Sequence, residues 1–389
     1  MKYRQIIFTL ITLVLVLLAT ELLFRGFLRM TGRQVILVLP SHEVLKKAWF
    51  KPHPNLVYVF KSDTTFTMNS PGHPRFTINH FGFRSTLQYD VHAIQKPENT
   101  IRVATLGGST TMGVNDDDKI WPYLLGVRLS TAIPERRIEV LNEGTQGYTS
   151  LDNLLDLSVR VIDFDCDVYV LYLGVNDLLA AAPLSIYRSD FSHFRSTIYE
   201  SLYDSPSNRI PGWLLKSVMV RAILQRSGCP DSRSLMDNTA TKQFRKGYKI
   251  PIQEQPEVDE KVRSTMERNI RSMIGVIRVH NPAALIVLPS FYDLYNRPVI
   301  IGMNEDMERV AGEQGALFVD AARGIPRDSS MVYDYGHFTV KGDSAMAEFL
   351  ANAIVRRMES DRARGGSAGR PLPVPEDSRP VSLPSRGGR

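Results

Sequence analysis

Three short polar motifs, each placed after an apolar run or before a helical one, carry side chains that could together perform acyl-transfer chemistry. Gly-Gly-Ser-Thr occupies residues 107–110, Gly-Val-Asn-Asp occupies 174–177, and Asp-Tyr-Gly-His occupies 334–337. In that order they supply a serine nucleophile, an amide that can donate to an oxyanion, and a histidine base with a carboxylate three residues before it. These groups are most of what the cleavage of an ester requires.

Ser109 is the candidate nucleophile. Residues 101–106 predict a short buried strand, and Gly107 and Gly108 then permit a tight turn. A serine on a strand-to-helix turn is exposed, and its backbone N–H lies near a helix N-terminus, where negative charge is stabilised. The alternatives are an ordinary glycine-rich loop and a phosphate-binding turn. The segment lacks the lysine of a P-loop and the full glycine pattern of a dinucleotide site.

His337 is the candidate general base, and Asp334 is the candidate acid that orients it. A spacing of three residues in a loop lets both side chains lie on one side of a turn, where the carboxylate fixes the imidazole tautomer. The alternative is an unrelated surface pair, since the chain contains eight histidines. The catalytic interpretation is favoured because the pair comes just before a predicted helix at 341–358 that would complete an α/β fold.

Asn176 is the candidate oxyanion donor. Residues 167–173 predict a buried strand that ends at Gly174, so Asn176 is expected on the loop at the carboxyl end of that strand. Open parallel sheets bind their ligands at this edge, and a neutral amide can donate there without a proton transfer. An asparagine in an ordinary turn is the alternative.

A fourth segment, residues 140–150, also follows a strand-like run, and its two glycines allow the backbone to approach a substrate. With this segment in place, residues 75–357 resemble the SGNH hydrolases, the superfamily of GDSL esterases and lipases. The resemblance implies a three-layer αβα sandwich with a parallel sheet, the flavodoxin-like SGNH fold. It also implies hydrolysis of an ester without a metal or an organic cofactor.

The resemblance implies roles for five residues. They are Ser109, Asp334 and His337 as the catalytic triad, and Ser109, Gly147 and Asn176 as the oxyanion hole. Gly144 is close enough to compete with Gly147 for the same role. The chain departs from the family's Gly-Asp-Ser triplet, because it carries Gly108 where aspartate is common. An Asn-His-Phe-Gly-Phe-Arg element at 79–84 is similar to one found upstream in membrane-anchored members.

Alternating strand and helix patterns predict one α/β hydrolase domain at 101–358. The expected strands cover 101–106, 137–142, 167–173, 284–288 and 316–320. The expected helices cover 120–132, 150–162, 261–280, 303–314 and 341–358. Such repeats imply right-handed crossovers and a parallel sheet covered by helices on both faces. Residues 26–100 are expected to form a stem and an extension of short strands and turns packed on the core.

Residues 178–260 interrupt this alternation and are expected to be an insertion. A structureless loop of that length is improbable inside a compact domain, and residues 213–224 have an apolar helical pattern. Because the insertion follows Asn176, its base lies at the catalytic edge, which favours a lid or a substrate-selecting element. The alternative is a helix packed on the outer face with a polar stretch, 231–255, behind it.

The N-terminus predicts a transmembrane helix. Residues 6–24 are predominantly apolar, and about 20 such residues span a bilayer core. Residues 19–21 make a poor signal-peptidase site, so an uncleaved anchor over 1–25 is expected rather than a cleaved signal peptide. Basic residues flank both ends, so the positive-inside rule does not fix the orientation. We expect an exported domain on the periplasmic or extracytoplasmic side, with a cytoplasmic domain as the alternative.

The net charge of +6 is concentrated at the two ends of the chain. Residues 1–47 carry +5 and residues 361–389 carry +3, which leaves −2 for the remainder. A near-neutral core lacks the basic face that nucleic-acid binding needs. Residues 359–389 are rich in Arg, Pro, Gly and Ser, which predicts a disordered tail. Cys166 and Cys229 show no metal-ligand spacing, and lone thiols are favoured over a disulfide.

The sequence therefore predicts a single-pass membrane protein with a serine hydrolase domain. Its expected substrate is a small-molecule or glycan ester with a short acyl group, such as an O-acetyl group on a glycan. Transfer of the acyl group to a glycan hydroxyl is the alternative within enzymes. A non-catalytic carbohydrate-binding or assembly module on the same scaffold is the alternative from another class, and the intact motif set argues against it.

Overall fold

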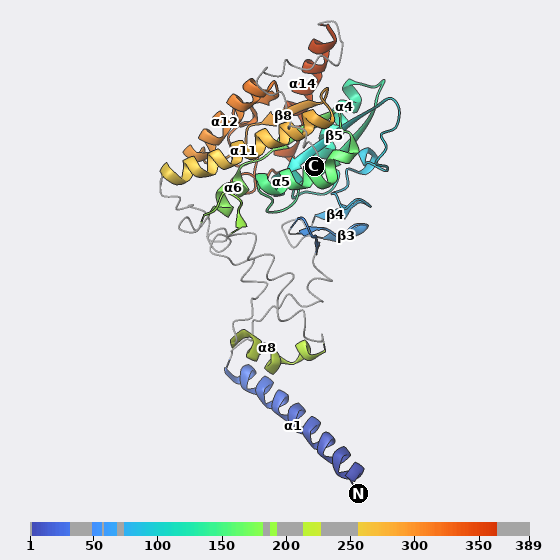
Figure 1. Ribbon diagram of the computed structural model, residues 1–389, viewed down its shortest axis with the longest axis vertical. Helices are drawn as coiled ribbons and strands as arrows, with labels where there is room; N and C mark the ends of the chain where they lie inside the picture. Colours follow the sequence, from blue (N-terminus) through green and yellow to red (C-terminus); the bar gives the residue numbers. More distant parts are fainter. Residues whose placement is uncertain are drawn as a thin grey trace, which may run out of the picture.

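The computed structural model describes residues 2–31, 49–56, 58–67, 74–181, 187–192, 213–226 and 256–363. Its centre is a five-stranded sheet (Figure 1) made of β5 (Thr100–Gly107), β6 (Arg137–Asn142), β7 (Val168–Tyr172), β8 (Leu285–Pro289) and β9 (Leu317–Val319). The strand order is β6-β5-β7-β8-β9, and every neighbouring pair is parallel. The predicted α/β fold with a parallel sheet is confirmed, and each of the five strands lies within one residue of its expected bounds.

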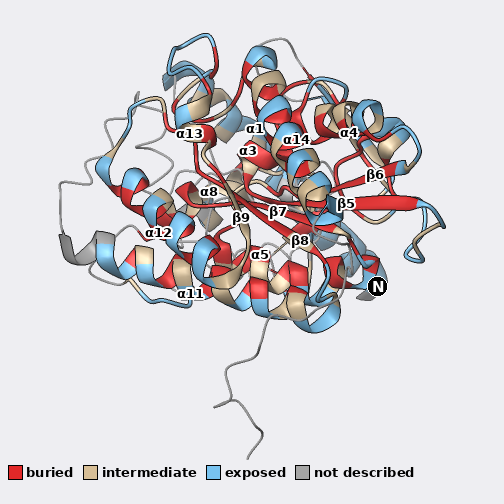
Figure 2. Ribbon diagram, turned by 90° about the horizontal axis from the view of Figure 1, so that it is seen from above, coloured by how far each residue is buried: buried red, intermediate tan, exposed pale blue. Residues whose placement is uncertain are grey.

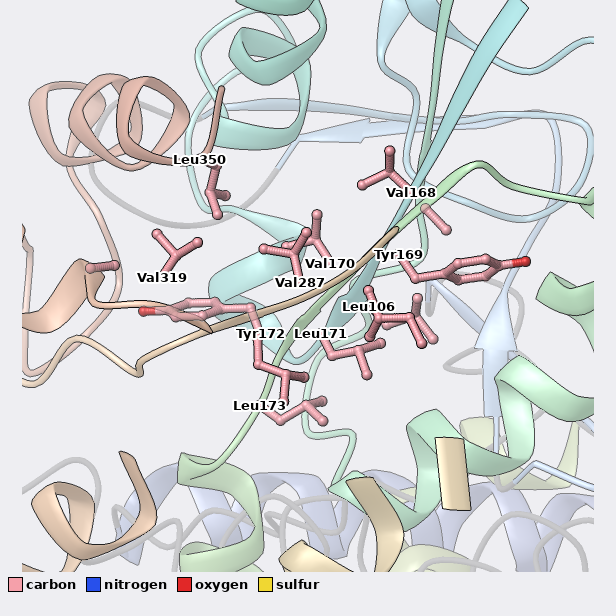
Figure 3. Close-up of a cluster of buried hydrophobic side chains, with 14 of the residues drawn as sticks. Leu106, Val168, Tyr169, Val170, Leu171, Tyr172, Leu173, Val287, Val319 and Leu350 are labelled. Atoms are coloured by element: carbon pink, nitrogen blue, oxygen red, sulfur yellow. The ribbon is translucent and has the colours of Figure 1, made fainter. Parts of the chain in front are cut away.

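The central strands β5 and β7 are buried along their whole length. Their residues are mostly aliphatic, β-branched and aromatic, as expected for strands covered on both faces. Figure 3 shows Leu106 and Val170 among the side chains of this core. Gly107 at the end of β5 pairs with Tyr172 at the end of β7. The segments that follow these two strands therefore start side by side.

Helices cover both faces of the sheet and complete three layers (Figure 2). On one face α4 (Trp121–Ala132) packs against α14 (Val340–Ala363). On the other face α5 (Ser150–Asp156) and α12 (Pro298–Gln314) pack against α11 (Pro256–His280). This arrangement buries the sheet between two helical layers, as the alternating sequence pattern predicts.

Several helices differ from their predicted ranges. The helix expected at 150–162 ends as an α-helix at Asp156 and continues as a π-helical turn at Leu157–Val161. Helix α12 begins earlier than predicted, at Pro298, because proline suits the first turn of a helix. Helix α14 continues to Ala363, so the first residues of the predicted tail at 359–389 are helical.

The chain before the sheet forms two antiparallel pairs of short strands. β1 (Phe50–Pro52) pairs with β2 (Tyr58–Phe60), and β3 (Thr64–Thr67) pairs with β4 (Arg75–Ile78). A bridge between Arg84 and Asn142 then joins this N-terminal extension to the end of β6. The extension is therefore attached at the carboxyl edge of the sheet.

Helix α1 (Lys2–Thr31) extends away from the sheet, with α8 (Val218–Arg226) across its end (Figure 1). It is long and apolar enough over Tyr3–Thr31 to cross a membrane, and none of its most apolar stretch is buried. Other expected features lie outside the described residues. These are Cys229, the polar stretch at 231–255 and the tail beyond residue 363.

Candidate active site

Ser109 is the first residue of α3 (Ser109–Met112), a single helical turn that begins directly after β5. Gly108 is the N-cap residue, with an extended backbone. The first N–H groups of a helix have no acceptor within the helix, so the Ser109 N–H is available to a ligand. The Ser109 hydroxyl lies 2.8 Å from Nε2 of His337.

Asp334 holds the opposite side of the His337 ring. Nδ1 of His337 lies 2.7 Å from Oδ2 of Asp334, and Oδ1 of Asp334 accepts the N–H groups of Gly336 at 3.0 Å and His337 at 2.9 Å. Burial raises the pKa of Asp334, but the hydrogen bonds from His337 and the backbone outweigh it, so the pKa lies below its ordinary value. An ionised carboxylate at Nδ1 favours the tautomer that leaves Nε2 as the acceptor for the Ser109 hydroxyl.

The two residues lie on a small hairpin that leads into α14. Tyr333 donates its N–H to the His337 carbonyl at 2.8 Å, and Val332 pairs with Phe338. The Phe338 ring is buried and packs near the rings of Tyr172 and Tyr292. These contacts fix the hairpin against the end of β7.

A buried polar link joins the serine segment to this hairpin. Nδ2 of Asn115 donates to the Phe338 carbonyl at 3.1 Å and to Oδ2 of Asp343 at 2.6 Å. The Tyr333 hydroxyl donates to Oδ1 of Asn115 at 2.9 Å. Sequence reasoning missed Asn115 and Asp343, because no local pattern indicates a contact between segments 228 residues apart.

Arg84 holds the far end of α3. Its buried guanidinium donates to the carbonyls of Met112 and Gly113, each at 2.7 Å, and lies 3.6 Å from the centre of the Phe76 ring. Burial lowers the pKa of Arg84 to about 10, which leaves it charged at neutral pH. The element at 79–84 therefore supports the helical turn that carries Ser109.

Asn176 lies in the first turn of α6 (Val175–Ala180), and the prediction that it lies on a loop is wrong. The chain turns into this helix at Gly174, whose φ of 134° suits only glycine. Nδ2 of Asn176 donates one N–H to the Tyr148 carbonyl at 2.9 Å. An amide carries two such protons, so the second remains for another acceptor.

Gly108 and Asn176 are in close contact. A Cβ atom at position 108 would lie 2.2 Å from Nδ2 of Asn176, so any side chain there would displace the amide. This contact gives a structural reason for glycine at position 108.

The structure distinguishes Gly147 from Gly144 as the candidate backbone donor of the oxyanion hole. The Gly144 N–H donates to Oδ1 of Asn142 at 3.1 Å, and a Cβ at Gly144 would lie 2.1 Å from the backbone nitrogen of Met112. Gly147 is half-buried with φ of 79°, and within the described ranges no protein acceptor is recorded for its N–H. Gly147 is therefore the better candidate for binding a ligand oxygen.

Tyr58 from the N-terminal extension fixes the peptide between Gln146 and Gly147. Its hydroxyl donates to the Gln146 carbonyl at 2.5 Å, and the Tyr148 hydroxyl donates in return to the Tyr58 carbonyl. In a trans peptide the N–H and the C=O point in opposite directions. Holding the Gln146 carbonyl therefore turns the Gly147 N–H away from Tyr58. Sequence reasoning missed Tyr58, whose partner lies 88 residues away.

Asp177 links the Asn176 helix to the segment that contains Gly147. Its carboxylate accepts the Ser150 N–H at 2.9 Å and the Ser150 hydroxyl, and that hydroxyl accepts from Asn269 at 2.8 Å. Burial raises the pKa of Asp177 to about 7, partly offset by the hydrogen bonds from Ser150. The link fixes α6 relative to the start of α5.

Across the described parts of the chain, no group of three or more His, Cys, Asp or Glu side chains is arranged to hold a metal ion.

One protein family and several solved structures are similar to this chain. The sequence model of the GDSL-like lipase/acylhydrolase family matches residues 105–345. Similar solved structures include LAE5, an alpha/beta hydrolase from a Lake Arreo metagenome, with 15% identity over 67% of this chain and 96% of that chain, at a TM-score of 0.38. Axe2, an acetylxylan esterase from Geobacillus stearothermophilus, has 14% identity over 66% and 94%, at 0.38. The lipase Lip_vut3 from a goat rumen metagenome has 14% identity over 65% and 97%, at 0.42. No curated protein matches the chain significantly.

Proposed function

Because the chain belongs to the GDSL-like lipase/acylhydrolase family and is a hydrolase of ester bonds, we propose that Ser109 is its nucleophile. His337 acts as the general base and Asp334 as the acid that orients it. The observation that carries this proposal is the continuous chain of hydrogen-bond distances, 2.8 Å from Ser109 to His337 and 2.7 Å from His337 to Asp334. A serine, an imidazole and a carboxylate in this order are the arrangement that activates a hydroxyl for acyl transfer.

In the first step Ser109 Oγ attacks the ester carbonyl carbon and its proton passes to Nε2 of His337. The tetrahedral intermediate collapses when His337 returns that proton to the departing alcohol, which leaves an acyl group on Ser109. Asp334 stays ionised and stabilises the imidazolium. Water then attacks the acyl-serine and gives a proton to His337. His337 passes this proton to Ser109 Oγ as the bond to the acyl group breaks, which releases the carboxylic acid and regenerates Ser109.

The oxyanion hole consists of three donors, which are the backbone N–H groups of Ser109 and Gly147 and the free amide proton of Asn176. Each comes from a different segment at the carboxyl edge of the sheet. Among the described residues, no protein acceptor is found for the N–H groups of Ser109 and Gly147, which supports their assignment. Donors fixed in place before reaction stabilise developing charge without reorganisation.

The substrate is an ester with a short acyl group, and an O-acetyl group on a glycan is the leading case. Gln146 and Asn176 are polar and only half-buried, so polar side chains lie beside the oxyanion donors. A long alkyl chain needs an extended apolar lining, whereas a small acyl group on a polar alcohol suits these neighbours.

A substrate panel tests this proposal. The detergent-purified full chain is assayed with p-nitrophenyl acetate, butyrate and octanoate and with acetylated xylo-oligosaccharide, beside the variants Ser109→Ala and Ser158→Ala. We expect hydrolysis that declines with acyl length, is lost in Ser109→Ala and is retained in Ser158→Ala, because Ser158 is exposed on the outer helical layer. Highest activity on octanoate would overturn the short-acyl assignment.

The same panel separates hydrolysis from acyl transfer. Deacetylated xylo-oligosaccharide is added as an acceptor, and free acetate and acetylated acceptor are both measured. Free acetate as the main product supports the hydrolase. Acetate recovered mainly on the acceptor would identify a glycan O-acyltransferase that uses the same acyl-serine, and a lack of any serine-dependent reaction would favour a binding module.

We also propose a role in the cell for each part of the chain. Residues 1–25 act as a membrane anchor, 26–100 as stem and N-terminal extension, 101–358 as the hydrolase domain with the insertion 178–260, and 359–389 as the tail. The catalytic domain lies on the extracytoplasmic side. External protease added to spheroplasts should degrade the domain, and protection until lysis would place it in the cytoplasm. Recovery of a mature chain without residues 1–24 would show a cleaved signal peptide.

A further inference from the structure

Glu21, near the end of the apolar run of α1, caps a helix from the middle of the insertion. Its carboxylate accepts the Ser217 hydroxyl at 2.7 Å and the N–H groups of Val218 at 2.7 Å and Met219 at 3.1 Å. These donors form the start of α8, whose first N–H groups have no acceptor within their own helix. A carboxylate at this end also suits the helix dipole. Residues almost 200 positions apart thus share one capping interaction.

A second contact fixes the same junction. Arg25, one turn after Glu21 in α1, forms an ion pair with Glu21 at 2.8 Å and donates to the Lys216 carbonyl at 3.0 Å. The Glu21 side chain is only 16% exposed as a result. Two adjacent turns of α1 therefore hold the segment that begins α8.

We propose that α8 is an amphipathic helix that lies in the membrane interface, held at the end of the transmembrane helix by Glu21. The inference rests on the proposal that α1 is a membrane anchor. Glu21, Arg25 and Arg29 mark where the apolar run gives way to charge, and this transition belongs at the bilayer surface. A helix whose first N–H groups bind Glu21 must therefore begin at the bilayer surface.

The side chains of the segment suit the same environment. Trp213 is 71% exposed and Ile223 is 59% exposed, although both are large and apolar. Tryptophan is enriched at membrane–water interfaces, and amphipathic helices bury an apolar face there. Lys216 at the start of this segment and Arg29 in α1 are also exposed and can pair with anionic headgroups.

This contact also gives Glu21 a reason to occur in an apolar helix. An unpaired carboxylate near a bilayer core is costly, and its hydrogen bonds to α8 and Arg25 reduce that cost. Removal of α1 as a signal peptide would leave the N–H groups of Val218 and Met219 without this acceptor. The structure thus assigns the middle of the insertion to membrane docking.

Fluorescence depth measurement tests the proposal. The full chain with Cys229→Ser and Ile223→Cys is labelled with the environment-sensitive dye NBD in nanodiscs of phosphatidylethanolamine and phosphatidylglycerol. The matched control is Val279→Cys, which is 80% exposed at the end of α11. We expect blue-shifted emission at position 223 and several-fold stronger quenching by headgroup-level spin-labelled lipid than at position 279. Equal, water-like signals at the two positions would overturn the proposal.

Glu21→Leu tests the cap itself, because leucine keeps α1 apolar but removes the acceptor. Quenching at position 223 should fall towards that of the control, while the protein stays in the membrane fraction after carbonate extraction. Unchanged quenching would show that Glu21 does not hold α8. Ester hydrolysis is measured on the same nanodiscs, so a failure of the catalytic assignment is seen separately from a failure of membrane docking.

Discussion

Gly108 leaves room for the amide of Asn176, since a Cβ at position 108 would lie 2.2 Å from Nδ2 of Asn176. Residues other than glycine can adopt the backbone φ of −93° found at Gly108, so it is the contact with Asn176, and not the backbone conformation, that requires glycine.

The first prediction follows from this contact between Gly108 and Asn176. Asn176→Ala should lower kcat by roughly 10²–10³-fold, the usual cost of one oxyanion donor. Gly108→Ala should lower kcat by about tenfold or more with little change in thermal stability, because only the end of a side chain has to move.

The double variant Gly108→Ala/Asn176→Ala provides the control for this pair. If Gly108→Ala acts by displacing the amide, it should cause no further loss once the amide is gone. Losses that multiply in the double variant would contradict the proposed contact.

The second prediction concerns the dependence of activity on pH. The pKa of Asp334 lies below its ordinary value, so its carboxylate is ionised throughout the range from about pH 5 to 8 and adds no step there. Any rise of activity with pH in this range should therefore be a single step, because a general base has to be deprotonated before it can accept a proton. The measurement is kcat/KM for p-nitrophenyl acetate across that range, and a flat profile would argue against a histidine base.

Asp334→Asn tests the orienting carboxylate directly. An amide favours the wrong imidazole tautomer, and kcat should fall by about 10⁴-fold, as in related triads. The exposed pair Asp63 and His80, 3.1 Å apart, offers a matched control, and Asp63→Asn should leave kcat unchanged. Equal effects of the two substitutions would remove Asp334 from the site.

The third prediction concerns Tyr58, which lies outside the matched family region. Tyr58→Phe keeps the ring but removes the hydroxyl that holds the Gln146 carbonyl. Loss of one such hydrogen bond corresponds to about 0.5–1.5 kcal/mol, so kcat should fall roughly 2- to 10-fold while KM changes little. Tyr89→Phe, which removes a hydroxyl 3.0 Å from Ser130 in the helical layer, should leave kcat unchanged. A change confined to KM would indicate a substrate contact for Tyr58 instead.

The fourth prediction uses the buried carboxyl of Asp177. Its pKa is about 7 in the folded protein and close to 3.9 in an unfolded chain, so the folded state holds the extra proton between these values. Asp177 by itself should therefore lower the free energy of unfolding as pH rises from about 4 to 7, by at most about 1.4 kcal/mol per pH unit. In urea titrations Asp177→Asn should make the decline shallower than in the wild type, and the remaining decline comes from other buried carboxyls such as Asp343, whose pKa burial raises to about 8. Asp163→Asn at an exposed position should keep the wild-type slope. A variant with the wild-type slope would show that Asp177 does not titrate in this range.

The sheet and the candidate triad could be predicted because their signals are local. The central strands β5 and β7 are continuous runs of buried residues. Ser109, Asp334 and His337 each lie beside a strand or helix boundary that the sequence marks. Helix α6 was missed because Val175–Ala180 is too short to show helical periodicity. The contacts of Asn115 with Asp343, and of Glu21 with α8, join distant segments, and only the packed fold brings their partners together.

The most direct test of the account is the site of covalent labelling by a fluorophosphonate probe. Such a probe reacts with an activated serine, and mass spectrometry of the digested protein identifies the modified residue. We predict modification of Ser109 alone, loss of labelling and of ester hydrolysis in Ser109→Ala, and unchanged labelling in Ser158→Ala. Modification of a different serine, with Ser109 intact in an active enzyme, would contradict the proposed mechanism.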